Sequence, residues 1–390
     1  MVNHGSYPLH LLSASARAVV EATAPVVAAR MPTITPDFYR RLFDAHPELL
    51  DGMFNRSTQA SGRQSSALAG SVVTFAVALL DGHHPVDLVN RIAGRHASLG
   101  VTEPMYAIVY EHLFAAIAAD LGDAATDTVV AAWTEVYWLF ANLLTARERT
   151  LYGQQANSAH WTPWRIAATT PRSSTVREFT FDPADDTPIT AASAGQYVGV
   201  RVTMPDGVRQ VRQYSLLGPG TGRRVAVKLD EGGEVSPVLH ALEPGALVDL
   251  SNPYGDLTLD DRSTPLVLAT AGIGCTPALS FLEQLAARES EREVLVLHAE
   301  RSRAEWAFST AIAGLVDRLP NASLETWFDD EPPRSRMDLS SVALPRDADL
   351  LLCGPVGFMQ AIRHQAVATG IPDERIRYEV FGPDSWLKSS

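Results

Sequence analysis

The sequence has few cysteines, no long apolar run and too few basic residues to balance its acidic ones. The two cysteines, Cys275 and Cys353, do not suggest a disulfide scaffold or a metal cluster, and they suit a reducing compartment. No apolar run approaches the roughly 18 to 20 residues that cross a bilayer. The N-terminus also lacks the basic and apolar parts of a secretory signal. We therefore expect a cytoplasmic protein without membrane insertion.

The formal net charge of -13 argues against nucleic acid as a partner. Nucleic acids and anionic membranes both attract basic surfaces, so neither suits this chain. An anionic ligand must then be bound locally, by loops and helix ends. With 390 residues the chain is long enough for two or three domains, each with its own core.

Composition and periodicity divide the chain into three parts. Residues 1–152 are poor in proline and glycine and carry apolar stripes at helical spacing, such as Val129, Trp133, Val136 and Phe140. After the polar linker GQQANSAH, short β runs between turns predict an antiparallel β-barrel over 158–262. From 263 to 390, buried-strand patterns such as LVLAT and EVLVLHAE alternate with helical stretches. This pattern predicts an α/β domain with a mostly parallel sheet.

The stretch LVLATAGIGCTPALSFLEQL predicts a strand, a glycine turn and a helix. Gly272 and Gly274 let the backbone approach a ligand, and the helix N-terminus offers unpaired N–H groups to a pyrophosphate. We expect Thr276 to be the N-cap and Pro277 to occupy the first helical position. Pro277 replaces the third glycine of the dinucleotide fingerprint. An ordinary strand-to-helix turn therefore remains the alternative for this stretch alone.

Two earlier motifs combine residues that suit a flavin nucleotide. RQYSL offers Arg212 for a phosphate, Tyr214 as an aromatic plate and Ser215 as a hydroxyl donor. EGGEVSPVLH adds two glycines, whose bare backbone can approach a phosphate, and Ser236 to bond it. Each motif alone could be a plain strand or a glycine hairpin. Their order ahead of the glycine turn favours a nucleotide-binding module.

These motifs resemble the ferredoxin reductase-like flavoproteins, in which R-x-Y-S and G-G-x-x-S bind FAD on a barrel and a following α/β domain binds NAD(P)H. The C-terminal part of the chain shows the same resemblance. LLCGPVGFM resembles the family's segment beside the nicotinamide, and YEVFGP resembles its terminal segment, which lies against the flavin ring. Phe381 and Tyr197 can equally be core residues. The resemblance implies that the cofactor contacts are Tyr197, Arg212, Gln213, Tyr214, Ser215, Gly232, Gly233, Val235, Ser236, Gly272, Ile273, Gly274, Cys275, Thr276, Pro277, Cys353, Gly354, Pro355, Phe381, Gly382 and Pro383.

His96 ends an apolar helical stripe with Leu88 and Ile92, so its spacing alone suits a packed core residue or a metal ligand. A flavin can release single electrons to a metal centre. A histidine on an apolar helix can hold haem iron and leave the opposite iron position free for a gas. On that opposite side we expect polar donors in an apolar wall: Tyr39, Gln64 and Leu68, with Phe54 wedging the ring.

The whole chain resembles the bacterial flavohaemoglobins over nearly all of residues 30 to 390. The resemblance implies that His96 binds haem b and is hydrogen-bonded to Tyr106 and Glu148. It also implies a charge link between domains through Arg95 and Glu379. A solvated Glu148 paired with a neighbouring arginine, and a Tyr106 that only packs, are the plain alternatives. The sequence departs from the family at Arg95, Leu257 and Asp384, where lysine, phenylalanine and histidine are usual. These departures concern the surroundings of the flavin and the reaction rates.

The resemblance implies an NAD(P)H-dependent nitric oxide dioxygenase, which oxidises NO with O2 to nitrate through FAD and haem. Reduction of alkyl or lipid hydroperoxides is a further activity that it suggests. The alternatives are a divergent flavohaemoglobin with another redox substrate and a sensor or store of O2 or NO. We expect a monomer, and a lipid in the distal pocket is left open. Arg301 and Arg303 follow the second strand, where an arginine could bind the 2′-phosphate of NADPH, but surface arginines are also common there. The choice between NADH and NADPH is therefore left open.

Overall fold

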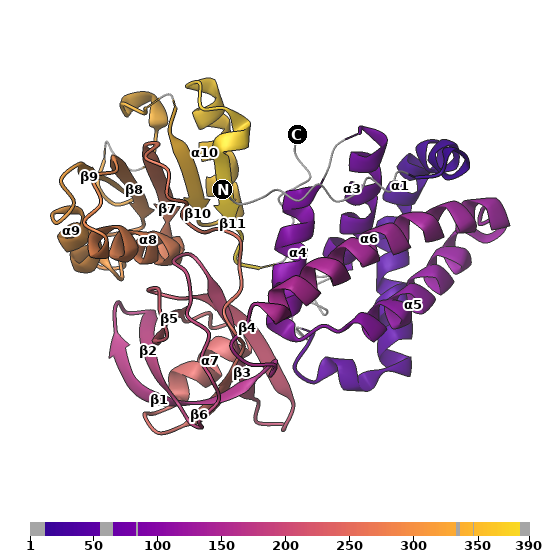
Figure 1. Ribbon diagram of the computed structural model, residues 1–390, viewed down its shortest axis with the longest axis horizontal. Helices are drawn as coiled ribbons and strands as arrows, with labels where there is room; N and C mark the ends of the chain where they lie inside the picture. The colour runs from indigo at the N-terminus through magenta and orange to yellow at the C-terminus, as the bar shows by residue number, and fades with distance from the viewer. Residues whose placement is uncertain (1–11, 55–64, 83–84, 333–335, 346, 383–390) are drawn as a thin grey trace. The chain divides into compact units, whose positions relative to one another are not determined.

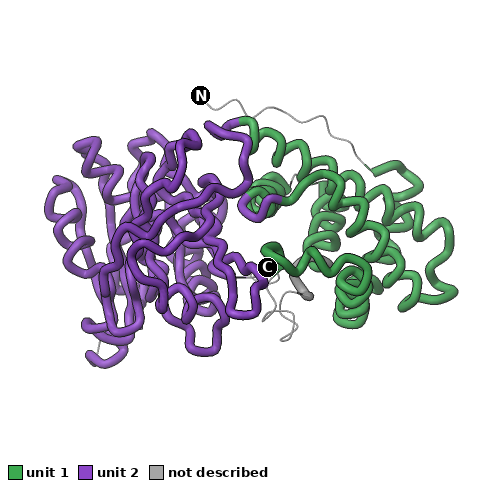
Figure 2. Tube along the Cα trace, turned by 90° about the horizontal axis from the view of Figure 1, so that it is seen from below, with its two compact units in different colours: residues 1–97, 101–153 green, residues 98–100, 154–390 purple. Residues whose placement is uncertain are grey.

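The computed structural model describes residues 12–54, 65–82, 85–332, 336–345 and 347–382, without the side chains of 65–69. The chain divides into two compact units (Figure 2). Unit 1 comprises residues 1–97 and 101–153, and unit 2 comprises 98–100 and 154–390. The fold classes agree with the predicted sequence of a helical part, an antiparallel sheet and a parallel sheet.

Unit 1 is helical (Figure 1). The long helix α1 contacts α3, α5 and α6. The predicted stripe on α6 faces the core, where Val136 is fully buried and Trp133 and Phe140 nearly so. The elements are α1 (Ala14–Ala45), η1 (Pro47–Leu50), α3 (Ser65–Leu80), α4 (Val86–Leu99), α5 (Glu103–Leu121), η2 (Gly122–Ala124) and α6 (Asp127–Gly153).

Among the described residues, α6 is the one helix whose length and hydropathy would suffice to cross a membrane. Its apolar side chains also form part of the unit 1 core, together with residues of α1 and α5. Core helices commonly combine these two properties, so length and hydropathy alone do not distinguish between the two roles of such a helix.

Unit 2 begins with an antiparallel sheet in the order β4-β3-β6-β1-β2-β5. An isolated bridge between Leu216 and Val225 links the end of β4 to β5, which joins the two edges of the sheet into a barrel. Helix α7 packs Val235 and Leu239 into the barrel core. The elements are β1 (Thr162–Pro171), β2 (Val176–Pro183), β3 (Tyr197–Thr203), β4 (Arg209–Ser215), β5 (Arg223–Lys228), α7 (Val235–Ala241) and β6 (Leu247–Leu250).

The second half of unit 2 is a parallel sheet in the order β11-β10-β7-β8-β9. Leu266 and Leu268 of β7 pack with α8 and α9, whereas Val267 and Ala269 pack with α10 on the opposite face (Figure 1). The elements are β7 (Leu266–Ala271), η3 (Gly272–Gly274), α8 (Cys275–Ala287), β8 (Val294–Glu300), α9 (Ser309–Val316), β9 (Ala322–Phe328), η4 (Leu339–Ser341), β10 (Asp349–Cys353), α10 (Val356–Ala368), η5 (Asp373–Arg375) and β11 (Ile376–Glu379).

The order of this sheet reverses at β7. The chain leaves β7 toward β8 on one side, and β10 later pairs with β7 on the other. In open α/β sheets, ligands bind outside the carboxyl ends of the strands at such a switch point. The ends of β7 and β10 are therefore where the topology places a ligand.

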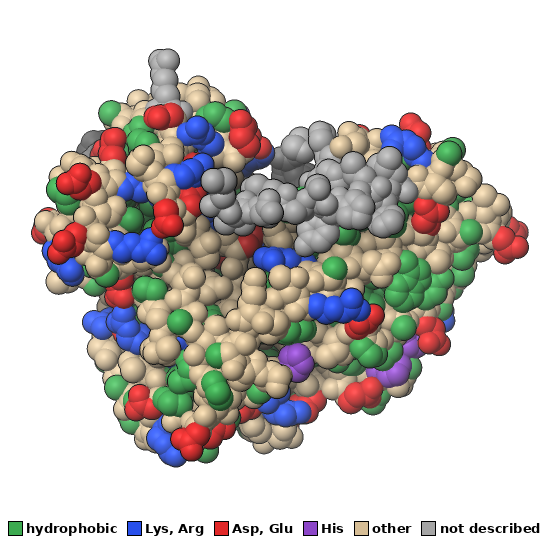
Figure 3. All heavy atoms as spheres, in the orientation of Figure 1, with side chains coloured by type: hydrophobic (Ala, Val, Ile, Leu, Met, Phe, Trp, Pro, Cys, Tyr) green, Lys and Arg blue, Asp and Glu red, His purple; other side chains and the backbone are tan. Residues whose placement is uncertain are grey.

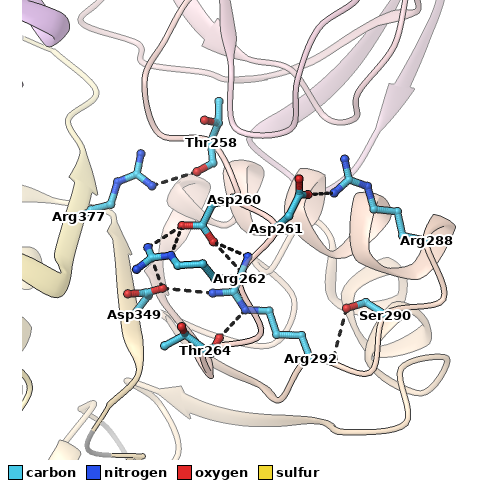
Figure 4. Close-up of polar contacts among 10 residues, drawn as sticks. All are labelled: Thr258, Asp260, Asp261, Arg262, Thr264, Arg288, Ser290, Arg292, Asp349 and Arg377. Carbon is cyan, nitrogen blue, oxygen red and sulfur yellow. Dashed lines mark hydrogen bonds and ion pairs between the residues drawn. The ribbon is translucent and has the colours of Figure 1, made fainter. Parts of the chain in front are cut away.

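At the amino ends of the strands, on the side away from the switch point, an ionic cluster holds the segment that precedes β7 (Figure 4). Arg292 lies 3.2 Å from Asp349, and their side chains are 5% and 9% exposed. Arg262 of this segment reaches the same carboxylate at 3.2 Å. Arg377 of β11 donates to the Thr258 carbonyl at 2.9 Å. The cluster thus fixes the path by which the chain enters the parallel sheet.

Candidate functional site

The side chains of His96, Tyr106 and Glu148 come from three separate helices of unit 1 and contact one another. The His96 Nδ1 atom on α4 lies 2.9 Å from the Tyr106 hydroxyl on α5 and 2.9 Å from Glu148 Oε1 on α6. The Tyr106 hydroxyl donates to the same Glu148 oxygen at 2.5 Å. Glu148 is 2% exposed and Tyr106 is 7% exposed, so a solvated Glu148 is ruled out.

This arrangement assigns the imidazole proton to Nδ1. The Glu148 carboxylate only accepts, and Tyr106 donates its own proton to that carboxylate, so Nδ1–H is the donor to both groups. Burial, together with the adjacent Glu148 charge, raises the pKa of Tyr106 and keeps it protonated. The Nε2 lone pair of His96 is then available to a metal, which fits an iron ligand.

Tyr137 is a member of this site that the sequence analysis missed. Its hydroxyl donates to the main-chain oxygen of Tyr106 at 2.6 Å, and its side chain is buried. Tyr137 therefore fixes the α5 backbone at the residue that contacts His96. Its position on the α6 stripe signals burial, but the sequence carries no sign of this hydrogen bond.

Tyr39 of α1 is buried among aromatic rings. Its ring centroid lies 4.7 Å from that of Phe38, 5.6 Å from that of Phe43 and 5.9 Å from that of Phe54. Burial raises the pKa of Tyr39, so its hydroxyl stays neutral and can donate. Within the described residues this hydroxyl has no hydrogen-bond partner. It is therefore available to a ligand.

The other two distal candidates cannot be placed in the same way. Gln64 lies outside the described residues, and the side chain of Leu68 on α3 is not described. Their predicted side-by-side position thus stays a prediction.

The RQYS motif lies on β4 as predicted, opposite β3. Tyr214 pairs with Val198 in register, and Ser215 pairs with Tyr197. Arg212 and Tyr214 share one face of the strand, whereas Gln213 and Ser215 share the other. Burial raises the pKa of Tyr214, so the hydroxyl remains neutral.

Tyr197 lies on the face of β3 opposite to the barrel-core residues Val198 and Val200, and its ring packs against Gly255. A Cβ on Gly255 would lie 3.0 Å from a ring carbon of Tyr197. Tyr197 is therefore buried outside the barrel core cluster, and a flavin contact by it stays a prediction.

The second flavin motif forms a tight turn before α7. The N–H groups of Gly232 and Gly233 donate to Asp230, at 3.1 Å to its side chain and 2.9 Å to its carbonyl. The Ser236 hydroxyl accepts from the Asp230 N–H at 3.0 Å. Val235 is buried in the barrel core. These groups shape the loop itself, and phosphate contacts by them stay a prediction.

The glycine turn after β7 packs against the Cys-Gly-Pro segment after β10. A Cβ on Gly274 would lie 2.3 Å from the Cys353 carbonyl oxygen, so only glycine fits there. A Cβ on Gly354 would lie 3.1 Å from Ala271 Cβ. Gly272 has φ +56°, which favours glycine as well. The two predicted motifs, Gly272 to Gly274 and Cys353 to Pro355, thus meet at the switch point.

Both cysteines at this edge are buried. Burial raises the pKa of Cys275 to about 12 and that of Cys353 well above its ordinary value. A thiol that stays protonated is a weak nucleophile, so these side chains pack rather than react.

The predicted helix start is wrong. Helix α8 begins at Cys275, directly after the turn η3, and its N-cap is Gly274. Thr276 therefore lies inside the first turn, where its hydroxyl donates to the Ile273 carbonyl at 3.0 Å. Pro277 is the third residue of the helix, two positions later than expected. The 3-10 turn continues into the α-helix, which shifts the start upstream of the threonine.

The C-terminal candidates lie at the end of β11. Glu379 pairs with Cys353 in register. Phe381 is 45% exposed, which contradicts the alternative of a core residue, and it precedes Gly382. Pro383 and Asp384 lie outside the described residues. Arg95 belongs to unit 1, so its link to Glu379 stays a prediction.

Three family models match successive parts of the chain. The globin model matches residues 36–144, the oxidoreductase FAD-binding domain residues 163–259, and the oxidoreductase NAD-binding domain residues 268–364. They confirm the predicted fold classes and the predicted cofactor set of haem, FAD and NAD(P)H.

Full-length relatives show the same organisation. The flavohemoproteins of Bordetella pertussis and Rhizobium meliloti are 40% and 36% identical to this chain. These alignments cover 95% and 96% of this chain and 99% of each relative.

Solved structures agree with these relatives. The crystal structure of a flavohemoglobin from Malassezia yamatoensis, with bound FAD and heme, is 44% identical with a TM-score of 0.92. It covers 95% of this chain and 100% of that one. The FAD/NAD-binding domain of a nitric oxide dioxygenase from Vibrio cholerae is 35% identical with a TM-score of 0.53, covering 57% of this chain and 99% of that one. The chain belongs to the flavohaemoprotein family.

Proposed function

We propose that this flavohaemoprotein is an NAD(P)H-dependent nitric oxide dioxygenase that oxidises NO with O2 to nitrate. The observation that carries the proposal is the hydrogen-bonded set of His96, Tyr106 and Glu148, in a chain that also contains both reductase domains. A globin that only stores a gas needs no reductase. The small-molecule partners are then O2, NO and NAD(P)H.

When bound, FAD would supply the conversion of hydride into single electrons, and haem would supply an iron centre for O2 and NO. His96 would hold the iron through Nε2. Glu148 and Tyr106 accept hydrogen bonds from the Nδ1–H group, which orient the ring and strengthen the imidazole as a donor to the metal.

Tyr39 supplies a neutral hydrogen-bond donor in an apolar pocket. Phe43 and Phe54 pack against it and exclude water from its surroundings. A donor that is fixed in a dry site stabilises developing negative charge more strongly than one in water. We assign Tyr39 to the stabilisation of the activated oxygen atoms.

The reductase half would bind the dinucleotide at the switch point. Gly272 would leave room for the pyrophosphate, since a Cβ added there would have only Glu300 Oε2 within 4 Å among the described residues, at 3.9 Å. The Cys353 to Pro355 segment lies against that turn, where the nicotinamide would be placed.

Turnover under air tests the proposal. We expect NADH or NADPH consumption to accelerate when NO is added, with nitrate formed in proportion to NO. Unchanged consumption would contradict a dioxygenase and favour an O2 store or sensor. Acceleration by an alkyl hydroperoxide, but not by NO, would favour the divergent redox enzyme.

The Tyr39→Phe variant tests the distal assignment. Loss of the donor should speed O2 release from the reduced protein by about 10- to 150-fold, since one hydrogen bond to a charged group contributes about 1.5–3 kcal/mol. Stopped-flow absorbance measures this rate. Tyr110→Phe is the matched control, because the Tyr110 hydroxyl is already paired with Thr134 at 3.0 Å. An unchanged rate in Tyr39→Phe removes Tyr39 from the mechanism.

Two further predictions belong to this proposal. The monomeric state and the cytoplasmic location, the latter expected from the sequence composition, remain predictions for this chain, and a lipid in the distal pocket is left open.

A further inference from the structure

The last residue of β8, Glu300, places a carboxylate beside the glycine turn. Strand β8 pairs with β7, with Ala299 opposite Ala271, so Glu300 lies next to the start of the turn. Its Oε2 atom is 3.9 Å from the position that a Cβ on Gly272 would occupy. The turn and Glu300 therefore face the same ligand space at the carboxyl edge of the sheet.

Main-chain contacts hold this carboxylate in place. The Arg301 N–H donates to Glu300 Oε1 at 3.0 Å. The Glu300 carbonyl accepts from the Asp329 N–H at 3.1 Å, which fixes the strand end against the loop after β9. One carboxylate oxygen is thus engaged by Arg301, whereas the other lies toward Gly272 as a hydrogen-bond acceptor.

Arg303, one of the two arginines that could meet a 2′-phosphate, is already engaged. Its guanidinium bonds both carboxylate oxygens of Glu331, at 2.6 and 2.9 Å. The same guanidinium lies 4.5 Å from the ring centroid of Phe328. Binding a phosphate through Arg303 would require breaking a bidentate ion pair.

Arg301 is the second arginine that could meet a 2′-phosphate, but its surroundings are acidic. Segments 300–305 and 329–331 carry five carboxylates against two arginines, a formal net charge of -3. The carboxylates are Glu300, Glu305, Asp329, Asp330 and Glu331. Such a field disfavours a dianionic phosphate and tolerates neutral ribose hydroxyls.

We propose that Glu300 is the residue that selects NADH over NADPH. In doubly wound sheets an acidic residue about 20 residues beyond the glycine turn accepts hydrogen bonds from the adenosine ribose. A carboxylate there repels the 2′-phosphate of NADPH. The inference rests on the dinucleotide site proposed above, and it does not depend on NO as the substrate.

Binding to the full-length, FAD-loaded protein tests this inference. NAD+ and NADP+ are titrated separately without NO, and dissociation constants are read from flavin difference spectra and calorimetry. The unmodified protein should bind NAD+ at least about tenfold more tightly than NADP+. Glu300→Gln should reduce that preference by about tenfold or more, since it removes the repelling charge and keeps the side chain's size.

Glu293→Gln is the matched control. Glu293 directly precedes β8, at the opposite edge of the sheet, and the substitution makes the same change of charge. It should leave the preference unchanged. A second variant, Glu331→Gln, frees Arg303 and should tighten NADP+ binding on its own.

Three results would overturn the inference: equal affinity for the two nucleotides in the unmodified protein, an unaltered preference in Glu300→Gln, or an equal change in Glu293→Gln. Binding of neither nucleotide would overturn the site itself. If Glu300→Gln loses its flavin, Glu300→Ala takes its place and should reduce the preference in the same way. A failed NO assay leaves these binding results intact, so the two proposals fail separately.

Discussion

His96 shows how two neighbours determine the chemistry of one atom. Because Glu148 and Tyr106 both face Nδ1, the proton stays there and Nε2 is left as a ligand. His96→Ala should therefore abolish tight haem binding and leave the flavin spectrum intact. Absorbance of the purified variant after supplementation with haem measures this. His46→Ala, a variant of a unit 1 histidine that pairs with Glu48, is the control. A normal haem band in His96→Ala would refute the assignment.

His298 of β8 is a buried histidine of a different kind. It is fully buried, its Nδ1 lies 2.8 Å from the Thr270 hydroxyl, and its ring stacks on Trp306 at 4.6 Å. Burial lowers the pKa of His298 from 6.5 to about 3. The folded protein thus keeps this ring neutral, whereas the unfolded chain protonates it near its ordinary pKa.

This difference makes the stability of unit 2 depend on pH. The contribution is fully present above about pH 6.5 and is lost as the pH falls from there toward 3, at up to about 1.4 kcal/mol per pH unit. His298→Gln should flatten this part of the profile. Urea unfolding of the full chain, followed by the flavin signal between pH 7 and 5, measures the slope. An identical slope in the variant would contradict the prediction, and His364→Gln on the exposed side of α10 is the control.

At the scale of elements, the dinucleotide edge depends on two turns that leave no space between them. Gly274→Ala would put a methyl group 2.3 Å from the Cys353 carbonyl, so the turn after β7 or that after β10 must move. We expect at least about a tenfold loss of NADH affinity, corresponding to about 1.4 kcal/mol. Anaerobic stopped-flow reduction of the flavin by NADH measures it.

Gly314→Ala on α9 is the matched control for that substitution. Nothing lies within 4 Å of the Cβ it would add, and Gly314 is within a helix. The variant should keep its NADH affinity and gain about 0.5–1 kcal/mol of stability from helix propensity. Equal NADH affinity in both variants would show that the two turns can separate without cost.

The sequence predicts the strands and helices because each carries its own periodicity. The stripes on α5 and α6 and the apolar runs of β7, β8 and β10 are visible in single segments. The prediction for Thr276 failed because the 3-10 turn of Gly272 to Gly274 runs directly into the helix, which the cap preference of one threonine does not reveal. Tyr137 could not be found, since its role arises only when distant segments meet.

The charge of the whole molecule explains why ligand sites are built from backbone and single residues. Both signs of charge are scattered over the face in Figure 3, among the side chains that the structure describes. With a net charge of -13, the chain does not attract anionic cofactors over long distances. We propose that loops and helix ends bind phosphate at close range instead.

The two units have separate cores, so we expect two unfolding transitions. The buried residues of the unit 1 core cluster lie between Leu12 and Leu144. Those of the three unit 2 clusters all lie at or after Trp164, so the two sets share no residue. A ligand stabilises only the unit that binds it. FAD at about 100 times its dissociation constant should add about 2.7 kcal/mol to unit 2. Calorimetry with haem and flavin absorbance separates the transitions.

His96→Ala is the decisive variant for that experiment, because it should remove stabilisation by haem from unit 1 and leave the FAD-dependent shift of unit 2 unaltered. Both transitions would merge if the units folded as one cooperative body, and FAD would then also raise the midpoint at which the haem band disappears. Independent shifts instead mean that the globin and reductase parts keep their own stability. Electron transfer would then be a property added by linking two folds rather than one that either fold requires.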